Sequence, residues 1–269
     1  MPSRARSRSL IEDSLVDQQP ISSSLSWTRS QCLNFRRAKR HGVIALDVYG
    51  TLVDPSGIAG ELGETFGPRA RAAALLWREK QLEYTFRRAL MRRYADFDTC
   101  TREALRYVSS SFDVTLSEAE ERTLLDAYLH LPAFPDVRNG LAKLQRAGYR
   151  LVALTNGTER SVRAMLESAA IGQYLDAVLS AERVRSFKPD PAVYALLDTV
   201  RGARDAPPWL VSGNPFDVIG AKGCGMKAAW LRRDPQRMFD PWEFSADIVA
   251  RDLEELCESL RLEAGSPRP

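Results

Sequence analysis

The 269-residue sequence is poor in the side chains that bind transition metals, with four cysteines and two histidines. They are far apart and form no C-x-x-C pair, which argues against a thiolate or imidazole metal site. Few, scattered cysteines are typical of a reducing cytosol, and no apolar segment resembles the core of a signal peptide. We therefore expect a cytoplasmic protein without a bound metal.

The sequence also lacks a long apolar run, because no stretch approaches the about 18 uninterrupted apolar residues that a membrane-spanning helix needs. Its net charge of +3 is unevenly placed: residues 1–42 hold eight Lys and Arg against three acids. We predict that 1–42 is a basic, disordered N-terminal extension. Such a tail could contact nucleic acid or a membrane surface, but the prediction is that neither is a partner.

Short apolar runs that alternate with helical segments define the rest of the chain. Five runs are strand-sized, and each is followed by helical character: 43–46, 150–154, 177–179, 209–211 and 228–231. Continuous apolar strands of this kind are typical of a parallel sheet buried on both faces. Residues 248–249 predict a further edge strand. The expected fold class is α/β, a Rossmann-like parallel sheet with helices on both faces.

The segment 55–133 interrupts this alternation with long helical patterns and no convincing strand. Its clearest helix carries an apolar stripe at Leu75, Leu82, Phe86 and Leu90. We predict a helical cap domain inserted after the first strand, above the crevice at the carboxyl ends of the strands. The α/β core domain then comprises 43–54 and 134–262, and 263–269 is a C-terminal tail.

Polar residues gather where the predicted strands end. Asp47 follows the first strand, residues 155–157 (Thr-Asn-Gly) the second, Lys188 the third, and residues 212–214 (Ser-Gly-Asn) with Asp217 the fourth. Each alone has a structural explanation as a turn or helix cap. Because parallel strands bring their carboxyl ends to one edge, together they predict an active site.

The charges in this set favour a nucleophilic role for Asp47. A lysine about 4 Å from a carboxylate contributes roughly 4 kcal/mol at an effective dielectric constant near 20, so Lys188 would keep Asp47 ionised. A carboxylate neutralised in this way is a poor general base, which is the competing role, but it can still attack an electrophilic carbon or phosphorus.

The motifs at these positions resemble the haloacid dehalogenase superfamily over about residues 43–260. They are D-V-Y-G-T-L at 47–52, T-N-G at 155–157, K-P at 188–189 and S-G-N-P-F-D at 212–217. Within the cap, W-R-E-K-Q-L-E-Y-T at 77–85 resembles the cap helix of the (S)-2-haloacid dehalogenases, the type II enzymes. This helix is the most specific signal in the chain.

Most members of the superfamily are Mg²⁺-dependent phosphatases, and this sequence departs from them at two places. Tyr49 replaces the second Asp that protonates a leaving alcohol, and residues 212–214 replace paired acids, so that Asp217 is the only acid there. A departing halide needs no proton, so both changes favour displacement at carbon. A phosphatase and a non-catalytic binding module of the same fold remain the alternatives.

The resemblance implies hydrolytic dehalogenation of short (S)-2-haloalkanoic acids to (R)-2-hydroxy acids and halide, through an aspartyl ester on Asp47. It implies no metal and no organic cofactor, a 2-haloacid substrate, a halide product, and a homodimer. The residues implied in catalysis are Asp47, Thr51, Arg78, Lys188, Ser212, Asn214 and Asp217. Those implied in binding substrate and halide are Val48, Tyr49, Arg78, Leu82, Phe97, Thr155, Asn156, Tyr194 and Phe216.

Three positions depart from what is common in the dehalogenases. Thr155 stands where serine is common but keeps the hydroxyl, and Phe216 replaces a frequent tryptophan. Gly213 stands where serine is usual, which leaves the water network near Asn214 and Asp217 to be defined by the structure.

Overall fold

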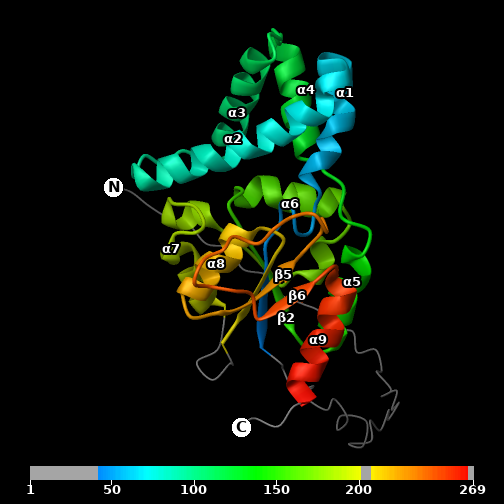
Figure 1. The fold of residues 1–269 in the computed structure, drawn as a ribbon, viewed down its shortest axis with the longest axis vertical. Coiled ribbons are helices and arrows are strands. Elements are labelled where there is room, and N and C mark those ends of the chain that lie inside the picture. Colours follow the sequence, from blue (N-terminus) through cyan, green and yellow to red (C-terminus); the bar gives the residue numbers. More distant parts are fainter. Residues whose placement is uncertain (1–41, 201–206, 266–269) are drawn as a thin grey trace, which may run out of the picture. The chain divides into compact units, whose positions relative to one another are not determined.

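A computed structural model describes residues 42–200 and 207–265, so the predicted basic extension lies outside the described residues. The core is a six-stranded parallel sheet in the order β3-β2-β1-β4-β5-β6 (Figure 1). The strands are β1 Val43–Leu46, β2 Arg150–Thr155, β3 Ala177–Ser180, β4 Trp209–Ser212, β5 Lys227–Leu231 and β6 Ile248–Ala250. The predicted parallel sheet is confirmed, including β6 at its edge.

The strand order places a topological switch point beside β1. Ala45 of β1 pairs with Val152 of β2 on one side and with Leu210 of β4 on the other. After β1 the chain forms β2 and then β3 on one side of β1. It then crosses to the other side of β1, where β4, β5 and β6 follow in order. Ligands of open α/β sheets bind beyond the carboxyl ends of the strands at such a point.

Helices cover both faces of the sheet. Ile44 and Leu46 face an apolar cluster that contains side chains of α5, α6 and α9. Val43 and Ala45, which alternate with them along the strand, face a second cluster built with α7 and α8. The helices are α5 Val137–Arg146, α6 Glu159–Ser168, α7 Pro191–Ala195, α8 Pro215–Gly223 and α9 Leu253–Gly265. Short 3-10 turns lie at η3 Gly172–Tyr174, η4 Ala181–Val184 and η5 Leu196–Thr199.

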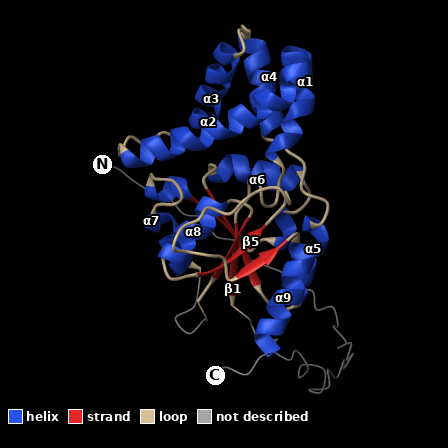
Figure 2. Cartoon of the chain, in the orientation of Figure 1, coloured by secondary structure: helices blue, strands red, loops and turns tan. Residues whose placement is uncertain are grey.

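The segment between β1 and α5 forms a separate group of helices, and in Figure 2 the strands all lie in the other part of the chain. Its elements are η1 Pro55–Ile58, α1 Ala59–Phe66, η2 Gly67–Arg69, α2 Ala70–Leu90, α3 Phe97–Ser111 and α4 Glu118–Tyr128. The chain enters and leaves this cap side by side, because Val53 bridges to Ala133 and the Asp54 amide donates to the Pro132 carbonyl at 2.9 Å. No described helix is long and apolar enough to cross a membrane.

Helix α2 forms where the sequence predicts it, but the predicted apolar stripe is not its buried face. Leu75 and Leu90 are 61% and 85% exposed, and Leu82 and Phe86 are half-buried. The fully buried face instead carries Ala70, Ala73, Ala74, Trp77, Gln81 and Thr85. Two of these are polar, and hydrogen bonds with α3 and α4 satisfy Gln81 within the bundle.

Replacement of Leu105 by alanine should destabilise the cap by about 2–5 kcal/mol, because its side chain is fully buried between cap helices and leaves a cavity. Leu90→Ala is the matched control and should change the free energy of unfolding by less than about 0.5 kcal/mol. Urea unfolding followed by circular dichroism measures both. Equal losses for the two variants would contradict the observed orientation of the cap helices.

Candidate active site

Asp47 lies directly beyond β1, at the carboxyl edge of the sheet. Its amide donates to the Val211 carbonyl at 3.0 Å and so continues the pairing between β1 and β4. The chain then folds back tightly, with the Gly50 amide bonded to the Val53 carbonyl at 2.8 Å and Gly50 at a φ of +81°. Glycine tolerates that conformation at low cost. The turn leaves the Asp47 carboxylate beneath the cap with only 6% of the residue exposed.

The two carboxylate oxygens of Asp47 have different surroundings. Oδ2 accepts hydrogen bonds from Thr51 Oγ1 at 2.6 Å and Asn214 Nδ2 at 2.8 Å, with Ser212 Oγ at 3.5 Å. Oδ1 receives Lys188 Nζ at 3.1 Å. The three neutral donors therefore gather on one oxygen, and the ammonium group lies on the other.

Lys188 lies between two buried carboxylates, with its Nζ also 2.8 Å from Asp217 Oδ2. Burial alone would lower the pKa of the Lys188 ammonium, but Asp217 and Asp47 outweigh burial and the pKa ends above its usual value. Lys188 thus carries its charge throughout the neutral range.

Burial shifts the pKa of Asp217 in the opposite direction to that of Lys188. Burial raises the pKa of Asp217, and the Asp47 carboxylate raises it further, while Lys188 and a hydrogen bond from Tyr194 act against both. The Tyr194 hydroxyl donates to Asp217 Oδ1 at 2.9 Å, and burial raises the pKa of this phenol well above its usual value. Tyr194 therefore remains a donor, and Asp217 is a better proton acceptor than an exposed aspartate.

Gly213 is explained by the close approach of two loops. A Cβ atom at this position would lie 2.1 Å from the Gly50 carbonyl oxygen, which is far inside van der Waals contact. The approach lets the Gly213 amide donate to Thr51 Oγ1 at 2.8 Å, and Thr51 in turn donates to Asp47. In this chain glycine at 213 is therefore a steric requirement, and Ser212 and Asn214 supply the polar side chains.

Arg78 reaches the site from helix α2 of the cap. Its Nη2 donates to the Tyr49 carbonyl at 3.3 Å, and its Nη1 donates to Gln81 Oε1 at 2.7 Å. Asn156 lies on the core side, and its Oδ1 accepts from the Lys188 amide at 2.8 Å. The Asn156 NH₂ group has no partner among the described residues, so a guanidinium and a free amide donor are available to an anion.

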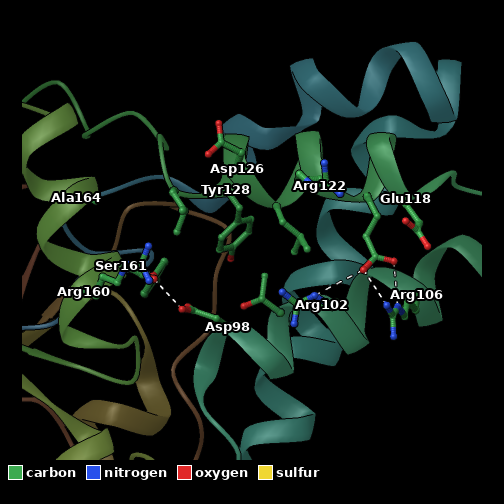
Figure 3. Close-up of a pocket in the computed structure, with 15 residues that line it drawn as sticks. Asp98, Arg102, Arg106, Glu118, Arg122, Asp126, Tyr128, Arg160, Ser161 and Ala164 are labelled. Carbon is green, nitrogen blue, oxygen red and sulfur yellow. Dashed lines mark hydrogen bonds and ion pairs between the residues drawn. The ribbon is translucent and has the colours of Figure 1, made fainter.

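These groups enclose a cavity of about 10 Å³, roughly the space of one water molecule. It is lined by Asp47, Tyr49, Arg78, Leu82, Phe97, Asn156, Lys188, Asn214 and Phe216. All nine are residues that the sequence singles out. A wider cleft of about 640 Å³ lies between α3, α4 and α6 and shares only Tyr49 with the cavity (Figure 3).

The other candidate residues lie behind the lining. Thr51, Ser212 and Asp217 contact the lining residues as described above. Tyr194, expected as a pocket wall, instead lies behind Asp217. Val48 is fully buried, and Thr155 Oγ1 accepts from the Gly157 amide at 3.1 Å, so neither side chain lines the cavity.

Gln81 and Phe86 are site residues that the sequence does not mark as such. Gln81 is fully buried, and it holds Arg78 while accepting from the Tyr128 hydroxyl at 3.0 Å. Phe86 packs edge-on against Phe216, with ring centroids 5.2 Å apart. The sequence does offer one indication for Gln81, because a glutamine three residues after Arg78 can contact it on the same helix.

The donor set does not suit a divalent cation. No group of three or more His, Cys, Asp or Glu side chains in residues 42–200 and 207–265 could hold a metal. Tyr49 stands where a phosphatase of this fold carries a second acid, and Asp217 is the only acid among residues 212–217. The residues therefore do not fit the magnesium site of a phosphatase.

A family profile described as haloacid dehalogenase-like hydrolase matches residues 41–197, more than half of the chain. The fold, the buried aspartate and this match together show that the chain belongs to the haloacid dehalogenase-like hydrolase family.

Within that family the similar proteins are dehalogenases. An (S)-2-haloacid dehalogenase of Pseudomonas sp. (strain YL) is 36% identical over 222 residues, which cover 82% of this chain and 95% of that protein. Another, from Xanthobacter autotrophicus, is 38% identical over 210 residues and covers 78% of each chain. A solved L-2-haloacid dehalogenase of X. autotrophicus with chloropropionic acid covalently bound superimposes with a TM-score of 0.77 at 32% identity, covering 82% and 98% of the two chains.

Tyr194→Phe should move the acid limb of the pH–rate profile upward by about one pH unit. The variant loses a hydrogen bond that lowers the pKa of Asp217, so Asp217 becomes protonated at a higher pH. Tyr107→Phe, at an exposed position of the cap, is the control and should leave the limb in place. An unchanged or lower acid limb in Tyr194→Phe would remove Asp217 as the titrating group.

Proposed function

We propose that the chain hydrolyses short (S)-2-haloalkanoic acids to (R)-2-hydroxy acids and halide. The observation that carries this proposal is the buried Asp47 carboxylate, held by Lys188 and facing Arg78 and the free Asn156 amide across a small cavity. The named activities of the similar dehalogenases support it. Tyr49 supports it as well, because a phosphatase would need an acid there.

The first step forms an ester between Asp47 and the substrate. A carboxylate oxygen attacks C2 from the side opposite the halogen, the carbon–halogen bond breaks with its electron pair, and the configuration inverts. Oδ1 accepts only from Lys188 among the described residues, whereas Oδ2 is engaged by Thr51 and Asn214, so Oδ1 is the freer nucleophile. Holding the reactants in line can supply roughly 7–11 kcal/mol.

The departing halide gathers negative charge and needs donors but no proton. Arg78 supplies a guanidinium group, and Asn156 supplies the amide that has no other described partner. Phe216 adds an apolar wall, and its contact with Phe86 excludes water from that side. Charge-assisted hydrogen bonds of this kind are strongest in a site without water.

The second step hydrolyses the ester and regenerates the free Asp47 carboxylate. Water attacks the ester carbonyl carbon of Asp47 and Asp217 takes one of its protons. The bond between that carbon and Oδ1 then breaks, and the departing alkoxide oxygen takes the proton back from Asp217 to give the hydroxy acid, while the proton left on the new Asp47 carboxyl group passes to solvent. The ester carbonyl is then Oδ2, so Thr51 Oγ1, Asn214 Nδ2 and Ser212 Oγ surround the developing oxyanion. The raised pKa of Asp217 suits this general base.

Even a three-carbon haloacid exceeds the space of one water, so the cap must move for the substrate to bind. The substrate carboxylate is assigned to backbone amides at the rim of the cavity, because Thr51 and Thr155, the side chains expected from the sequence, lie behind its lining. The reaction needs neither a metal nor an organic cofactor in this scheme. Nucleic acid and membranes have no part in it.

We further propose a cytoplasmic homodimer. The described cysteines, Cys100, Cys224 and Cys257, are all free thiols, as expected in a reducing compartment. Leu75 and Met91 give the cap exposed apolar surface that a second copy could cover.

Incubation with (S)-2-chloropropionate in EDTA should release chloride at the same rate as without EDTA. Asp47→Asn should lower that rate by at least about 1,000-fold, because an amide is not a nucleophile. Asp113→Asn, at an exposed position of the cap, is the matched control and should keep full activity. Chloride release by Asp47→Asn, or p-nitrophenyl phosphate hydrolysis that depends on Mg²⁺, would contradict the proposal.

A further inference from the structure

One carboxylate of the cap, in the wider cleft that Tyr49 also lines, is bound directly to the core. Asp98 Oδ2, on α3, accepts hydrogen bonds from Ser161 Oγ at 2.7 Å and Thr158 Oγ1 at 3.2 Å, both at the start of α6. Figure 3 shows the Asp98–Ser161 bond crossing the cleft between the two parts. The ion pairs of Arg102 and Arg106 in the same cleft join only cap residues.

The position of this carboxylate is electrostatically favourable. Thr158 is the N-cap of the ten-residue helix α6, and its Oγ1 accepts from the Ser161 amide at 3.2 Å. A negative charge near a helix N-terminus is stabilised by the aligned peptide dipoles. Asp98 therefore binds to two hydroxyl groups that are themselves held by the end of the helix.

Both ends of this contact are next to residues that line the reaction cavity. On the cap side, Phe97 precedes Asp98 and packs on the Tyr49 ring at 5.1 Å. On the core side, Thr158 follows Asn156 by two residues, and Asn156 carries the amide assigned to the halide. One carboxylate thus joins the wall made by the cap to the loop that carries a halide donor.

The cavity size shows why such a contact matters for turnover. At about 10 Å³ the cavity is smaller than a three-carbon haloacid, so its cap and core walls must move apart for the substrate to bind. The Asp98 hydrogen bonds lie in the cleft of about 640 Å³, where water could replace them during such a movement.

We propose that Asp98 is a positioning residue for dehalogenation, which fastens the closed cap to α6 and thereby fixes Phe97 and Asn156 around the substrate. The proposal rests on the function given above. It predicts an effect on the ester-forming step, because a displacement of about 1 Å can lower a rate by about 100-fold.

A double-mutant cycle tests it, with halide release followed in a single turnover of (S)-2-chloropropionate. Asp98→Ala and Ser161→Ala should each lower the single-turnover rate constant, by about 10-fold for the first. The double variant should be no slower than Asp98→Ala, because both changes remove one contact. Asp98→Asn, which keeps an acceptor oxygen, should lose less than Asp98→Ala.

Glu121→Gln is the matched control, because it breaks an ion pair in the same cleft that joins only cap helices. It should leave the single-turnover rate unchanged. Thermal unfolding of every variant separates stability from positioning: a lower midpoint with an unchanged rate constant in Asp98→Ala would overturn the proposal, as would additive losses in the cycle. Absence of halide release by the unaltered protein would instead contradict the proposed function.

Discussion

The active site depends on one buried ammonium group that serves two buried carboxylates. Lys188 is 1% exposed and contacts Asp47 at 3.1 Å and Asp217 at 2.8 Å. Removing one partner from such an arrangement leaves a buried charge without compensation, which typically costs about 3–5 kcal/mol. Burial raises the pKa of Asp217 and the Asp47 carboxylate raises it further, while the shared ammonium group only partly offsets this, so Asp217 keeps the raised pKa of a base.

The side chains around this ammonium group also restrict the chemistry of the family fold. Tyr49 stands where an acid would protonate a leaving alcohol, and the described residues offer no group of three acids, histidines or cysteines that could hold a divalent cation. Neutral donors then gather on Oδ2 of Asp47, where an ester hydrolysis develops charge. The cap completes the site with Arg78, whose guanidinium group lines the cavity and donates to the Tyr49 carbonyl.

Much of this could be predicted from the sequence because strand-sized apolar runs end at polar residues. In a parallel sheet those ends share one edge, so Asp47, Asn156, Lys188 and Asn214 had to meet. The face of α2 that is buried could not be predicted, because Gln81 is buried through hydrogen bonds to other helices, while Leu75 and Leu90 are left exposed.

Features that depend on contacts between distant segments also escaped prediction. Glycine is required at position 213 because the Gly50 carbonyl oxygen, 163 positions earlier, leaves no room for a side chain. Asp98 contacts Ser161 only because the cap lies over the core. Neither contact leaves a periodic pattern in the chain. The predicted disorder of the basic extension, residues 1–42, falls on residues 1–41 outside the described part of the chain and stays a prediction.

The central claim, that Asp47 forms an ester, is tested most directly by oxygen labelling. Excess enzyme is given one equivalent or less of (S)-2-chloropropionate in H₂¹⁸O, and the peptide containing Asp47 and the product are analysed by mass spectrometry. The account predicts one ¹⁸O in the Asp47 side chain and an unlabelled product hydroxyl. A labelled product hydroxyl with unlabelled Asp47 would show direct attack by water on the substrate and would contradict it.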